Sequence, residues 1–341
     1  MAAGPNGSVR PNSSDRPCKA SSAAACHHRP VPDHVVAGFP ASLPIDALDP
    51  LPPGAEPVPI DPATVGDGQL ARIEFLVPPG PASLGLLARM PALRVIQTLS
   101  AGVDWLAGHV PDGVRVCNAA GVYDTPLAEW TLAAILAVLR GFPGAEAAQR
   151  RGAWERFEPE ELLDRQVAIL GYGSIGRAVE ERLAPFGARI SRVGRTARPG
   201  VLGIGDLDGI LPLTEVLVVL LPLARTTVGL LDRRRLGLLP PGALVVNAGR
   251  GRVIDTAALR DDVGAGRLRA ALDVVDPEPL PSDDPLWRMP GALITPHVAG
   301  DTAAAEKRAI RLAADQLRRY AAGDEMRNEV PSYLLEQLDP A

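Results

Sequence analysis

A glycine-rich segment half-way along the 341-residue chain constrains its fold more than any other feature. In this segment, VAILGYGSIGRAVEERL, the residues Gly171, Gly173 and Gly176 fit the spacing G-x-G-x-x-G. An apolar run typical of a buried strand precedes them, and a helical pattern follows. Such glycines allow a tight turn, close approach of the backbone to a pyrophosphate and close packing of helix on strand. Ser174 and Ile175 would open the helix, whose N-terminal N–H groups bind phosphates. The segment predicts a dinucleotide-binding domain, although a turn that serves geometry alone has the same spacing.

Short apolar runs separated by Gly and Pro turns lie on both sides of this segment. They alternate with helical patterns, which is typical of parallel sheets covered by helices on both faces. A chain of this length favours two domains, so we predict an α/β protein with two doubly wound parallel-sheet domains, the dinucleotide-binding one inserted in the other. The predicted strands are Val35–Ala37, Ile73–Val77, Leu93–Thr98, Val114–Cys117, Val167–Leu170, Ile190–Val193, Val216–Leu221, Ala243–Asn247, Leu268–Asp273 and Ala292–Thr295.

Three helices are predicted outside the glycine segment. A short one covers Leu84–Arg89, and a last one runs from about residue 303 to 320 and should cross back onto the first domain. Between them a long helix begins with Thr125 as N-cap and Pro126 at the first helical position, and ends near Gly141. It is apolar nearly all round, so we expect it to be buried between domains or subunits.

The domain boundaries follow from these elements. Residues 1–33 are rich in Pro, Ser, Ala and Gly and have no hydrophobic period, which indicates a disordered tail. We expect a substrate domain formed by residues 34–119 and 298–341, and a dinucleotide-binding domain formed by residues 120–297.

Composition excludes several classes of function. The net charge of −5 has no long run of one sign, which argues against a nucleic acid or an anionic membrane as partner. The longest apolar stretch, Trp130–Leu139, is about half of what a membrane span needs. Three cysteines, Cys18, Cys26 and Cys117, have no metal-ligand spacing and favour a reducing cytoplasm over a disulfide framework.

Seven motifs follow one another along the chain after the tail: LSAGVD, PLAEWTLAAILAVLR, GYGSIG, LPLARTTVGLLD, NAGRGRVID, ALDVVDPEPL and TPHVAG. Together they resemble the D-isomer-specific 2-hydroxyacid dehydrogenase family over nearly the whole chain. The resemblance implies an NAD(P)-binding Rossmann domain inserted in a flavodoxin-like substrate domain, a homodimer, and hydride transfer between a nicotinamide cofactor and a small 2-keto or D-2-hydroxy acid. Arg250, Glu278 and His297 match the family's catalytic arginine, glutamate and histidine.

The chemistry of these three residue types suits that reaction. All three follow the ends of predicted strands, where ligands of open α/β sheets bind. The guanidinium of Arg250 would grip a carboxylate through paired hydrogen bonds. His297 would give and take a proton near neutral pH, and Glu278 would orient its far ring nitrogen and favour its charged form. Without the resemblance, a surface arginine and a structural histidine would explain the same pattern.

The resemblance also implies further contacts: a loop whose amides hold the substrate carboxylate, an acid that binds the nicotinamide amide, and a loop that lines the cofactor. The carboxylate-binding loop consists of Ala101, Gly102 and Val103. The acid is Asp273, and the loop that lines the cofactor contains Pro222 and Thr227. Ordinary turns and caps would also account for them. The aromatic residues Tyr123, Trp130, Trp154 and Trp287 could shape the substrate pocket, but core packing is the simpler explanation for each.

The end of the second strand of the dinucleotide domain predicts the cofactor. Gly194 stands where an NAD-selective enzyme of this fold usually has an acid for the ribose 2′-hydroxyl. Arg195, Thr196 and Arg198 follow it, and no Asp or Glu occurs until Asp206. Two guanidiniums and a hydroxyl suit a 2′-phosphate, so we predict NADP(H) as the preferred cofactor and NAD(H) as the second option. The arrangement resembles NADP-using glyoxylate/hydroxypyruvate reductases, although a solvated loop would also explain the arginines.

We therefore predict reduction of glyoxylate or hydroxypyruvate, with His297 as the acid/base. The chain ends soon after its last helix, which counts against a serine-regulated phosphoglycerate dehydrogenase. Alternatives of the same fold act on phosphite, formate or a bulkier 2-keto acid. The pairing of Glu278 with His297 disfavours formate, because the family's formate enzymes usually have Gln in place of this glutamate. A cofactor-sensing binding protein, like the family's corepressors, is the alternative from another class.

Overall fold

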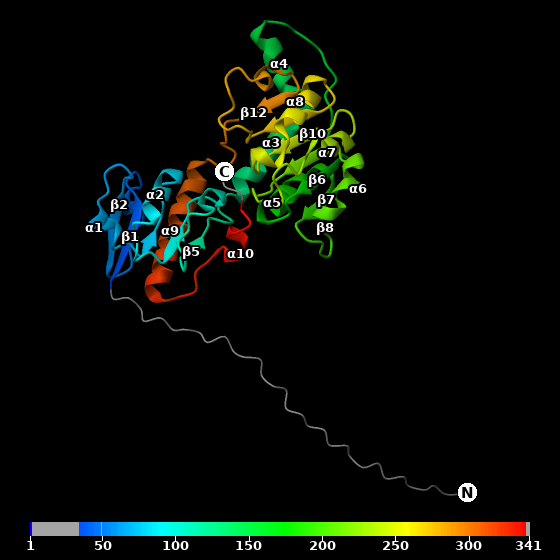
Figure 1. The fold of residues 1–341 in the computed structure, drawn as a ribbon. Coiled ribbons are helices and arrows are strands. Elements are labelled where there is room, and N and C mark those ends of the chain that lie inside the picture. Colours follow the sequence, from blue (N-terminus) through cyan, green and yellow to red (C-terminus); the bar gives the residue numbers. More distant parts are fainter. Residues whose placement is uncertain (2–33, 49, 339–341) are drawn as a thin grey trace.

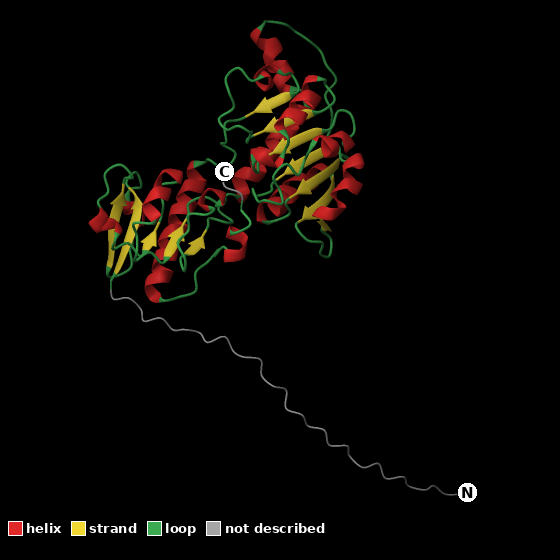
Figure 2. Ribbon diagram, in the orientation of Figure 1, coloured by secondary structure: helices red, strands yellow, loops and turns green. Residues whose placement is uncertain are grey.

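A computed structural model of the chain describes Met1 and residues 34–48 and 50–338, so the predicted tail, Met1 apart, lies outside the described residues. The described chain forms two lobes, each built on a parallel β-sheet with helices packed against it (Figure 2). We call them the five-stranded lobe and the seven-stranded lobe. The prediction of two doubly wound α/β units is confirmed.

The five-stranded lobe has the strand order β2-β1-β3-β4-β5, all parallel, which is the flavodoxin-like order. Its last helix, α9, covers one face of the sheet, with Leu317 and Tyr320 packed against Phe39 and Phe75. The return of the C-terminal helix to the first sheet is thereby confirmed. The elements are β1 (Val35–Pro40), β2 (Ala55–Ile60), α1 (Asp67–Leu70), β3 (Phe75–Leu76), α2 (Leu84–Leu87), β4 (Val95–Gln97), β5 (Arg115–Cys117), α9 (Ala303–Ala322) and α10 (Ser332–Leu335).

The seven-stranded lobe has the order β12-β11-β10-β9-β6-β7-β8, again all parallel. This is the Rossmann order with one added strand, and its order reverses between β6 and β9. Every strand predicted here is present, with ends within two residues of the prediction. The elements are α3 (Asp124–Leu139), α4 (Phe142–Arg150), β6 (Gln166–Leu170), α5 (Ser174–Leu183), β7 (Arg189–Gly194), β8 (Leu202–Gly203), α6 (Leu207–Ile210), β9 (Val216–Val219), α7 (Arg233–Leu238), β10 (Leu244–Asn247), α8 (Thr256–Gly264), β11 (Arg269–Leu272) and β12 (Ala292–Ile294).

The long helix α3 differs from its prediction at its start. It begins at Asp124, and Tyr123 occupies the N-cap position without a capping side-chain bond, so the assignment of Thr125 as N-cap is wrong. Asp124 instead places a negative charge in the first turn, which favours a helix N-terminus electrostatically. The helix packs against α5, β10 and β11. The side of the helix that faces these elements is therefore buried within the seven-stranded lobe.

The helix α4 continues from α3 after Gly141, whose φ of 68° turns the chain. Within residues 34–48 and 50–338, no single helix is long and apolar enough to span a membrane. The pair α3 and α4 passes that test only when the two are taken together across a 65° bend. Since the core of the seven-stranded lobe includes Ala128, Ile135 and Leu139 of α3, the apolar character of this helix has a structural explanation.

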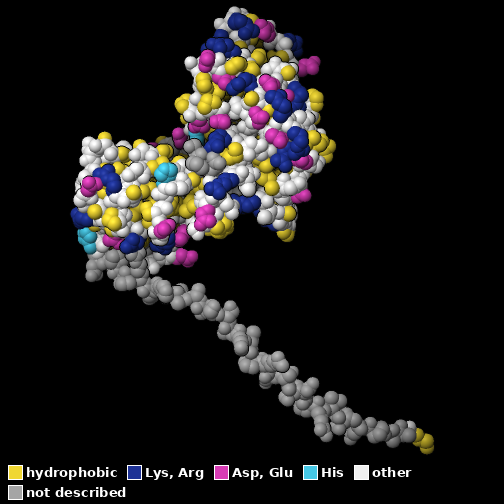
Figure 3. Space-filling view, viewed as in Figure 1, with side chains coloured by type: hydrophobic (Ala, Val, Ile, Leu, Met, Phe, Trp, Pro, Cys, Tyr) yellow, Lys and Arg dark blue, Asp and Glu magenta, His cyan; other side chains and the backbone are white. Residues whose placement is uncertain are grey.

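Two connections join the lobes, one from β5 to α3 and one from β12 to α9 (Figure 1). In the view of Figure 1, α10, drawn in red, lies next to this junction. Figure 3 shows positive and negative side chains intermixed over the visible face of both lobes.

Candidate active site

The glycine turn after β6 leaves no room for a side chain at Gly171 or Gly176. Gly171 has a φ of 107°, and a Cβ atom there would lie 2.7 Å from the backbone oxygen of Leu220. A Cβ on Gly176 would lie 2.7 Å from the backbone oxygen of Gly171, so α5 packs directly on the turn. Gly173 is the N-cap of α5, and nothing lies within 4 Å of where its Cβ would be. The first turn of α5 can therefore be approached closely by a ligand.

The two residues that open α5 have different surroundings. The Ser174 hydroxyl donates a hydrogen bond to Asp124 Oδ1 at 3.0 Å, and so ties the start of α5 to the start of α3. Ile175 packs against the core of the seven-stranded lobe. Both residues can thus offer a phosphate their backbone N–H groups, whereas their side chains serve the fold.

A cavity of about 470 Å³ lies beside this turn. The Thr227 hydroxyl donates to the backbone oxygen of Pro222 at 2.7 Å and accepts from the N–H of Ala224 at 2.8 Å, which fixes the loop on one side of the cavity. Thr196 is not among the lining residues. The cavity, which we call the nucleotide cavity, is lined by Gly171, Tyr172, Gly173, Gly194, Arg195, Arg198, Ile204, Leu220, Leu221, Pro222, Ala224, Thr226, Thr227 and Gln337.

The arginines after β7 border the nucleotide cavity. Arg198 Nη2 donates to the backbone oxygen of Tyr172 at 2.7 Å, so its guanidinium lies across the glycine turn. A Cβ on Gly194 would lie 2.8 Å from Arg198 Nη1, which means that the missing side chain makes room for this guanidinium. Arg195 is exposed and lines the same cavity. The end of β7 thus presents positive charge where a carboxylate would occupy an NAD-selective site.

His297 follows β12 in a strained backbone conformation. Its φ of 54° is uncommon for a residue with a side chain, and such strain often occurs at functional sites. Its Nδ1 lies 2.6 Å from Glu278 Oε1. An ionised carboxylate can only accept, so Nδ1 carries the proton of this hydrogen bond. That assignment leaves Nε2 as the nitrogen available to a ligand.

Asp273 holds the turn that carries His297. Its buried carboxylate accepts hydrogen bonds from the Thr295 hydroxyl at 2.6 Å and from the N–H groups of Val298 and Ala299, each at 2.9 Å. Its backbone oxygen accepts from the N–H of His297 at 2.8 Å. The structure therefore gives this residue an orienting role, and its contact with the nicotinamide stays a prediction.

Arg250 follows β10 and is held by an acid from the other lobe. Its Nε and Nη2 lie 2.9 to 3.2 Å from the carboxylate oxygens of Asp104, and its Nη1 donates to the backbone oxygen of Gly249 at 2.8 Å. The Asp104 side chain is only 5% exposed. Two N–H groups of the guanidinium, one on each terminal nitrogen, stay available to a substrate. Sequence analysis did not single out Asp104, although it is the last residue of the LSAGVD motif. The available signal was a carboxylate directly after an apolar loop residue. A carboxylate that is buried at such a place needs a charged partner.

These groups meet at a second cavity of about 160 Å³, the substrate cavity. Of the predicted loop, Ala101 and Gly102 line it, whereas the Val103 side chain is buried in the five-stranded lobe. Glu278 is not among the lining residues, and its carboxylate contacts the cavity residue His297. The lining residues are Ser100, Ala101, Gly102, Tyr123, Leu127, Ala248, Arg250, Asp273, His297, Gly300 and Asp301.

The four aromatic candidates differ in position. Tyr123 lines the substrate cavity, and its hydroxyl donates to the backbone oxygen of Leu99; burial raises the pKa of this hydroxyl, so it stays a donor near neutral pH. Trp130 packs against the core. Trp154 is 96% exposed and Trp287 is 48% exposed, so core packing is the wrong explanation for these two. Trp154 follows α4 in a loop that leaves its ring uncovered.

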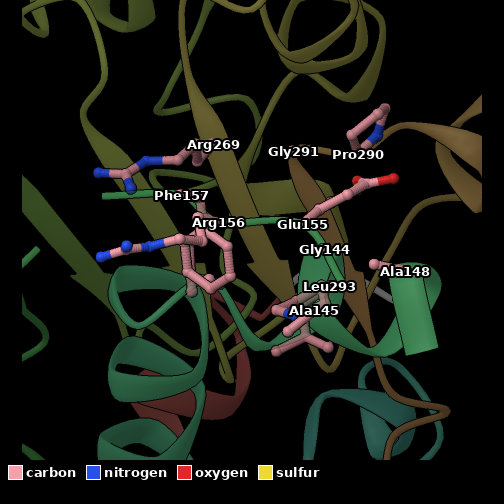
Figure 4. A pocket seen from close by; sticks show the side chains of 14 residues that line it. Gly144, Ala145, Ala148, Glu155, Arg156, Phe157, Arg269, Pro290, Gly291 and Leu293 are labelled. Carbon is pink, nitrogen blue, oxygen red and sulfur yellow. The ribbon is translucent and has the colours of Figure 1, made fainter. Parts of the chain in front are cut away.

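A third cavity, of about 310 Å³, lies between α4, the loop after it and β12. It shares no lining residue with the other two cavities. Figure 4 shows Arg156, Phe157 and Arg269 grouped on one side of it. The site chemistry described above therefore involves only the nucleotide and substrate cavities.

Comparison with known proteins agrees with this geometry. Residues 132–299 match the family description "D-isomer specific 2-hydroxyacid dehydrogenase, NAD binding domain". A crystal structure of a D-isomer specific 2-hydroxyacid dehydrogenase from Xanthobacter autotrophicus, in complex with NADPH and MES, is 31% identical with a TM-score of 0.76, covering 89% of this chain and 100% of that one. The chain belongs to this family.

Two other relatives differ in their activity. D-3-phosphoglycerate dehydrogenase of Mycobacterium bovis is 36% identical over 249 residues, which are 70% of this chain and 47% of that protein. The chain thus spans about half the length of this curated dehydrogenase. The NADPH-dependent glyoxylate/hydroxypyruvate reductase of Sinorhizobium meliloti, crystallised with NADP and sulfate, is 28% identical with a TM-score of 0.78, covering 89% of this chain and 99% of that one. Membership of the family therefore does not fix the substrate.

Proposed function

We propose that this dehydrogenase uses NADPH to reduce small 2-keto acids with a single negative charge, such as glyoxylate or hydroxypyruvate, to D-2-hydroxy acids. The observation that carries the proposal is the meeting of Arg250 and His297 on one small cavity, close to a second cavity that suits a dinucleotide. The open first turn of α5 and the guanidiniums of Arg195 and Arg198 fit the phosphates of such a cofactor. The bound nicotinamide supplies a hydride to the carbonyl carbon.

The protein side chains complete the reaction. The two free N–H groups of Arg250 would bind the substrate carboxylate and polarise its carbonyl, because a guanidinium matches paired oxygens. Nε2 of His297 would donate a proton to the carbonyl oxygen as the alkoxide forms, and the ring would then take a proton from solvent. Glu278 would keep Nδ1 protonated and the ring in place.

The charges in the substrate cavity favour a single anionic group on the substrate. Among the described residues that line it, only Arg250 and His297 can carry positive charge, whereas Asp273 and Asp301 carry negative charge. Arg250 is needed for the carboxylate of any 2-keto acid. A second anionic group, such as the phosphate of 3-phosphohydroxypyruvate, would find no cation there and would meet Asp301 instead. This argues against the activity in the name of the mycobacterial relative.

Steady-state kinetics with glyoxylate, hydroxypyruvate and 3-phosphohydroxypyruvate test this proposal. We expect kcat/KM to be highest for an unphosphorylated acid, and Asp301→Asn to reduce the discrimination against the phosphorylated acid by about tenfold, because one like charge is removed. A preference for 3-phosphohydroxypyruvate would overturn the proposed substrate class. Binding of NADPH with no turnover of any keto acid would favour a cofactor-sensing protein.

The preference for NADPH is tested by the ratio of kcat/KM values for NADPH and NADH. We expect the wild type to favour NADPH, and Arg195→Ala/Arg198→Ala to lose the preference mainly through a higher KM for NADPH. Arg189→Ala is the matched control, because it removes a positive charge at the other end of β7, where Arg189 pairs with Asp164. Equal use of both cofactors by the wild type, or a preference for NADPH that survives the double substitution, would refute the proposed role of these arginines.

We also propose that the chain forms a homodimer through α4 and the loop after it. Phe142, Trp154, Phe157 and Leu163 are each at least half exposed on this part of the seven-stranded lobe. Exposed aromatic side chains at this density are typical of protein interfaces. Sedimentation velocity should show a dimer for the wild type and a monomer for Trp154→Asp/Phe157→Asp. A wild type that sediments as a clean monomer would contradict the proposal.

A cytoplasmic location is part of the same proposal. Cys117 is a free cysteine buried in the five-stranded lobe, and such a thiol is compatible with a reducing compartment. Fractionation of cells that express the tagged full chain would test this location, and recovery outside the cytoplasm would contradict it.

A further inference from the structure

The C-terminal part of the chain extends from one lobe to the other. After α9 it runs back along the five-stranded lobe, where the N–H of Val330 donates to the backbone oxygen of Val116 at 2.8 Å. It then forms α10 and continues to the seven-stranded lobe. We call residues 332–338 the C-terminal strap; Figure 1 shows its helix, α10, beside the junction of the lobes.

Apolar side chains attach the strap to the five-stranded lobe. Leu335 and Leu338 are partly buried and pack against the hydrophobic cluster that includes Leu106 and Val116. Burying apolar side chains, even in part, stabilises this attachment. The strap therefore belongs to the lobe that contributes Ala101 and Gly102 to the substrate cavity.

The backbone of the strap pairs with the seven-stranded lobe. The N–H of Arg225 donates to the backbone oxygen of Gln337 at 2.9 Å, and Ala224 and Leu338 form an antiparallel bridge. Ala224 belongs to the loop that the Thr227 hydroxyl fixes beside the nucleotide cavity. The strap thus touches the loop that lines the proposed cofactor site.

Gln337 itself lines the nucleotide cavity, together with the glycine turn and the arginines after β7. It is the one residue of the five-stranded lobe among the described residues that line this cavity. Its side-chain amide offers two donors and an acceptor, which suits phosphate oxygens and ribose hydroxyls. A dinucleotide in the cavity would thus meet groups from both lobes.

We propose that Gln337 binds the NADP(H) cofactor directly through its side-chain amide, and that the strap thereby couples cofactor binding to the relative position of the lobes. The inference rests on the proposed function only in taking a nicotinamide dinucleotide as the ligand. The amide donates to a phosphate or ribose oxygen, while Leu335 and Leu338 hold the strap on the five-stranded lobe. Cofactor bound to the seven-stranded lobe then limits how far the lobes can separate.

Direct titration of the full chain with NADPH, followed by cofactor fluorescence in the absence of any keto acid, tests this inference. Gln337→Ala should raise the Kd for NADPH by about tenfold, the effect of losing one hydrogen bond to a charged group. Gln337→Glu should raise it further, because a carboxylate repels the phosphates. Glu336→Gln is the matched control and should leave the Kd unchanged, since Glu336 does not line the nucleotide cavity.

The outcomes separate this inference from the proposed function. If Arg195→Ala/Arg198→Ala raises the Kd for NADPH while both Gln337 variants bind like the wild type, the inference is refuted and the proposed function stands. If the Gln337 variants bind NADPH weakly but the wild type reduces no keto acid, the proposed function fails and the inference stands. Gln337 is exposed, so we expect its variants to fold, and thermal melting checks this.

Discussion

Gly102→Ala tests the arrangement of the substrate cavity, because the added methyl group conflicts with Arg250. A Cβ atom at residue 102 would lie 1.7 Å from Arg250 Nη2 and 2.9 Å from its Cζ. Ordinary contacts between such atoms are about 3.5 Å, so the guanidinium would have to move by nearly 2 Å. It cannot move freely, since Asp104 and the backbone oxygen of Gly249 hold it. The φ angle of Gly102 is not positive, so alanine strains the site and not the local backbone.

The magnitude follows from this displacement. A misplacement of about 1 Å in a catalytic group can cost about 10²-fold in rate, which corresponds to about 2.7 kcal/mol of transition-state stabilisation. We expect kcat/KM for hydroxypyruvate to fall by at least about 10²-fold, with kcat and KM both affected, because Arg250 would serve substrate and transition state alike. The Kd for NADPH should not change, because Gly102 does not line the nucleotide cavity.

Steady-state kinetics, NADPH titration and thermal melting of the variant measure these effects. Gly85→Ala is the matched control: Gly85 lies in α2 of the same lobe, and no atom lies within 4 Å of where its Cβ would be. It should have wild-type kinetics. A Gly102→Ala enzyme with wild-type kcat/KM would show that the guanidinium of Arg250 does not lie against this loop during catalysis.

Three further predictions concern other parts of the chain. Asp104→Asn should lower kcat/KM by about tenfold or more, because a neutral amide cannot hold the guanidinium of Arg250 at two points; unchanged kinetics would contradict the pairing. Burial raises the pKa of the Cys117 thiol to about 12. In the variant Cys18→Ser/Cys26→Ser, which keeps only Cys117, iodoacetamide should therefore not alkylate this thiol at mildly alkaline pH until urea unfolds the protein. Fast labelling of this folded variant would argue against that burial. Removing residues 2–33, whose sequence has no apolar period, should leave melting temperature and kcat/KM nearly unchanged, and loss of either would assign the segment a structural role.

Much of the fold could be predicted because parallel strands buried on both faces are continuous apolar runs. The strands at the centre of each sheet, such as Val167–Leu170 in β6, were recognisable in this way. The edge strand β2 was not, because its sequence AEPVPI contains two prolines, which remove hydrogen-bond donors and are tolerated mainly at sheet edges. The predicted start of α3 was also wrong, since a residue type that often caps helices, such as Thr125, does not guarantee that a helix begins after it.

The candidate site shows the same division between local and distant information. Arg250 and His297 lie at the ends of strands inside recognisable motifs, so sequence alone suggested them. The partner of Arg250 is Asp104, which is 146 residues away along the chain. Gln337 reaches the nucleotide cavity only because the chain crosses between the lobes after α9. No local pattern encodes such pairings, and they become visible only when the lobes are assembled.

We propose that His297, held by Glu278, donates the proton during hydride transfer from NADPH to a 2-keto acid. The most direct test is a single turnover of hydroxypyruvate with enzyme-bound NADPH, in the wild type and in His297→Ala, with analysis of the chirality of the product. We predict formation of D-glycerate by the wild type and a rate at least about 10²-fold lower in His297→Ala, at an unchanged Kd for NADPH. A His297→Ala enzyme that oxidises NADPH at the wild-type rate would contradict the claim.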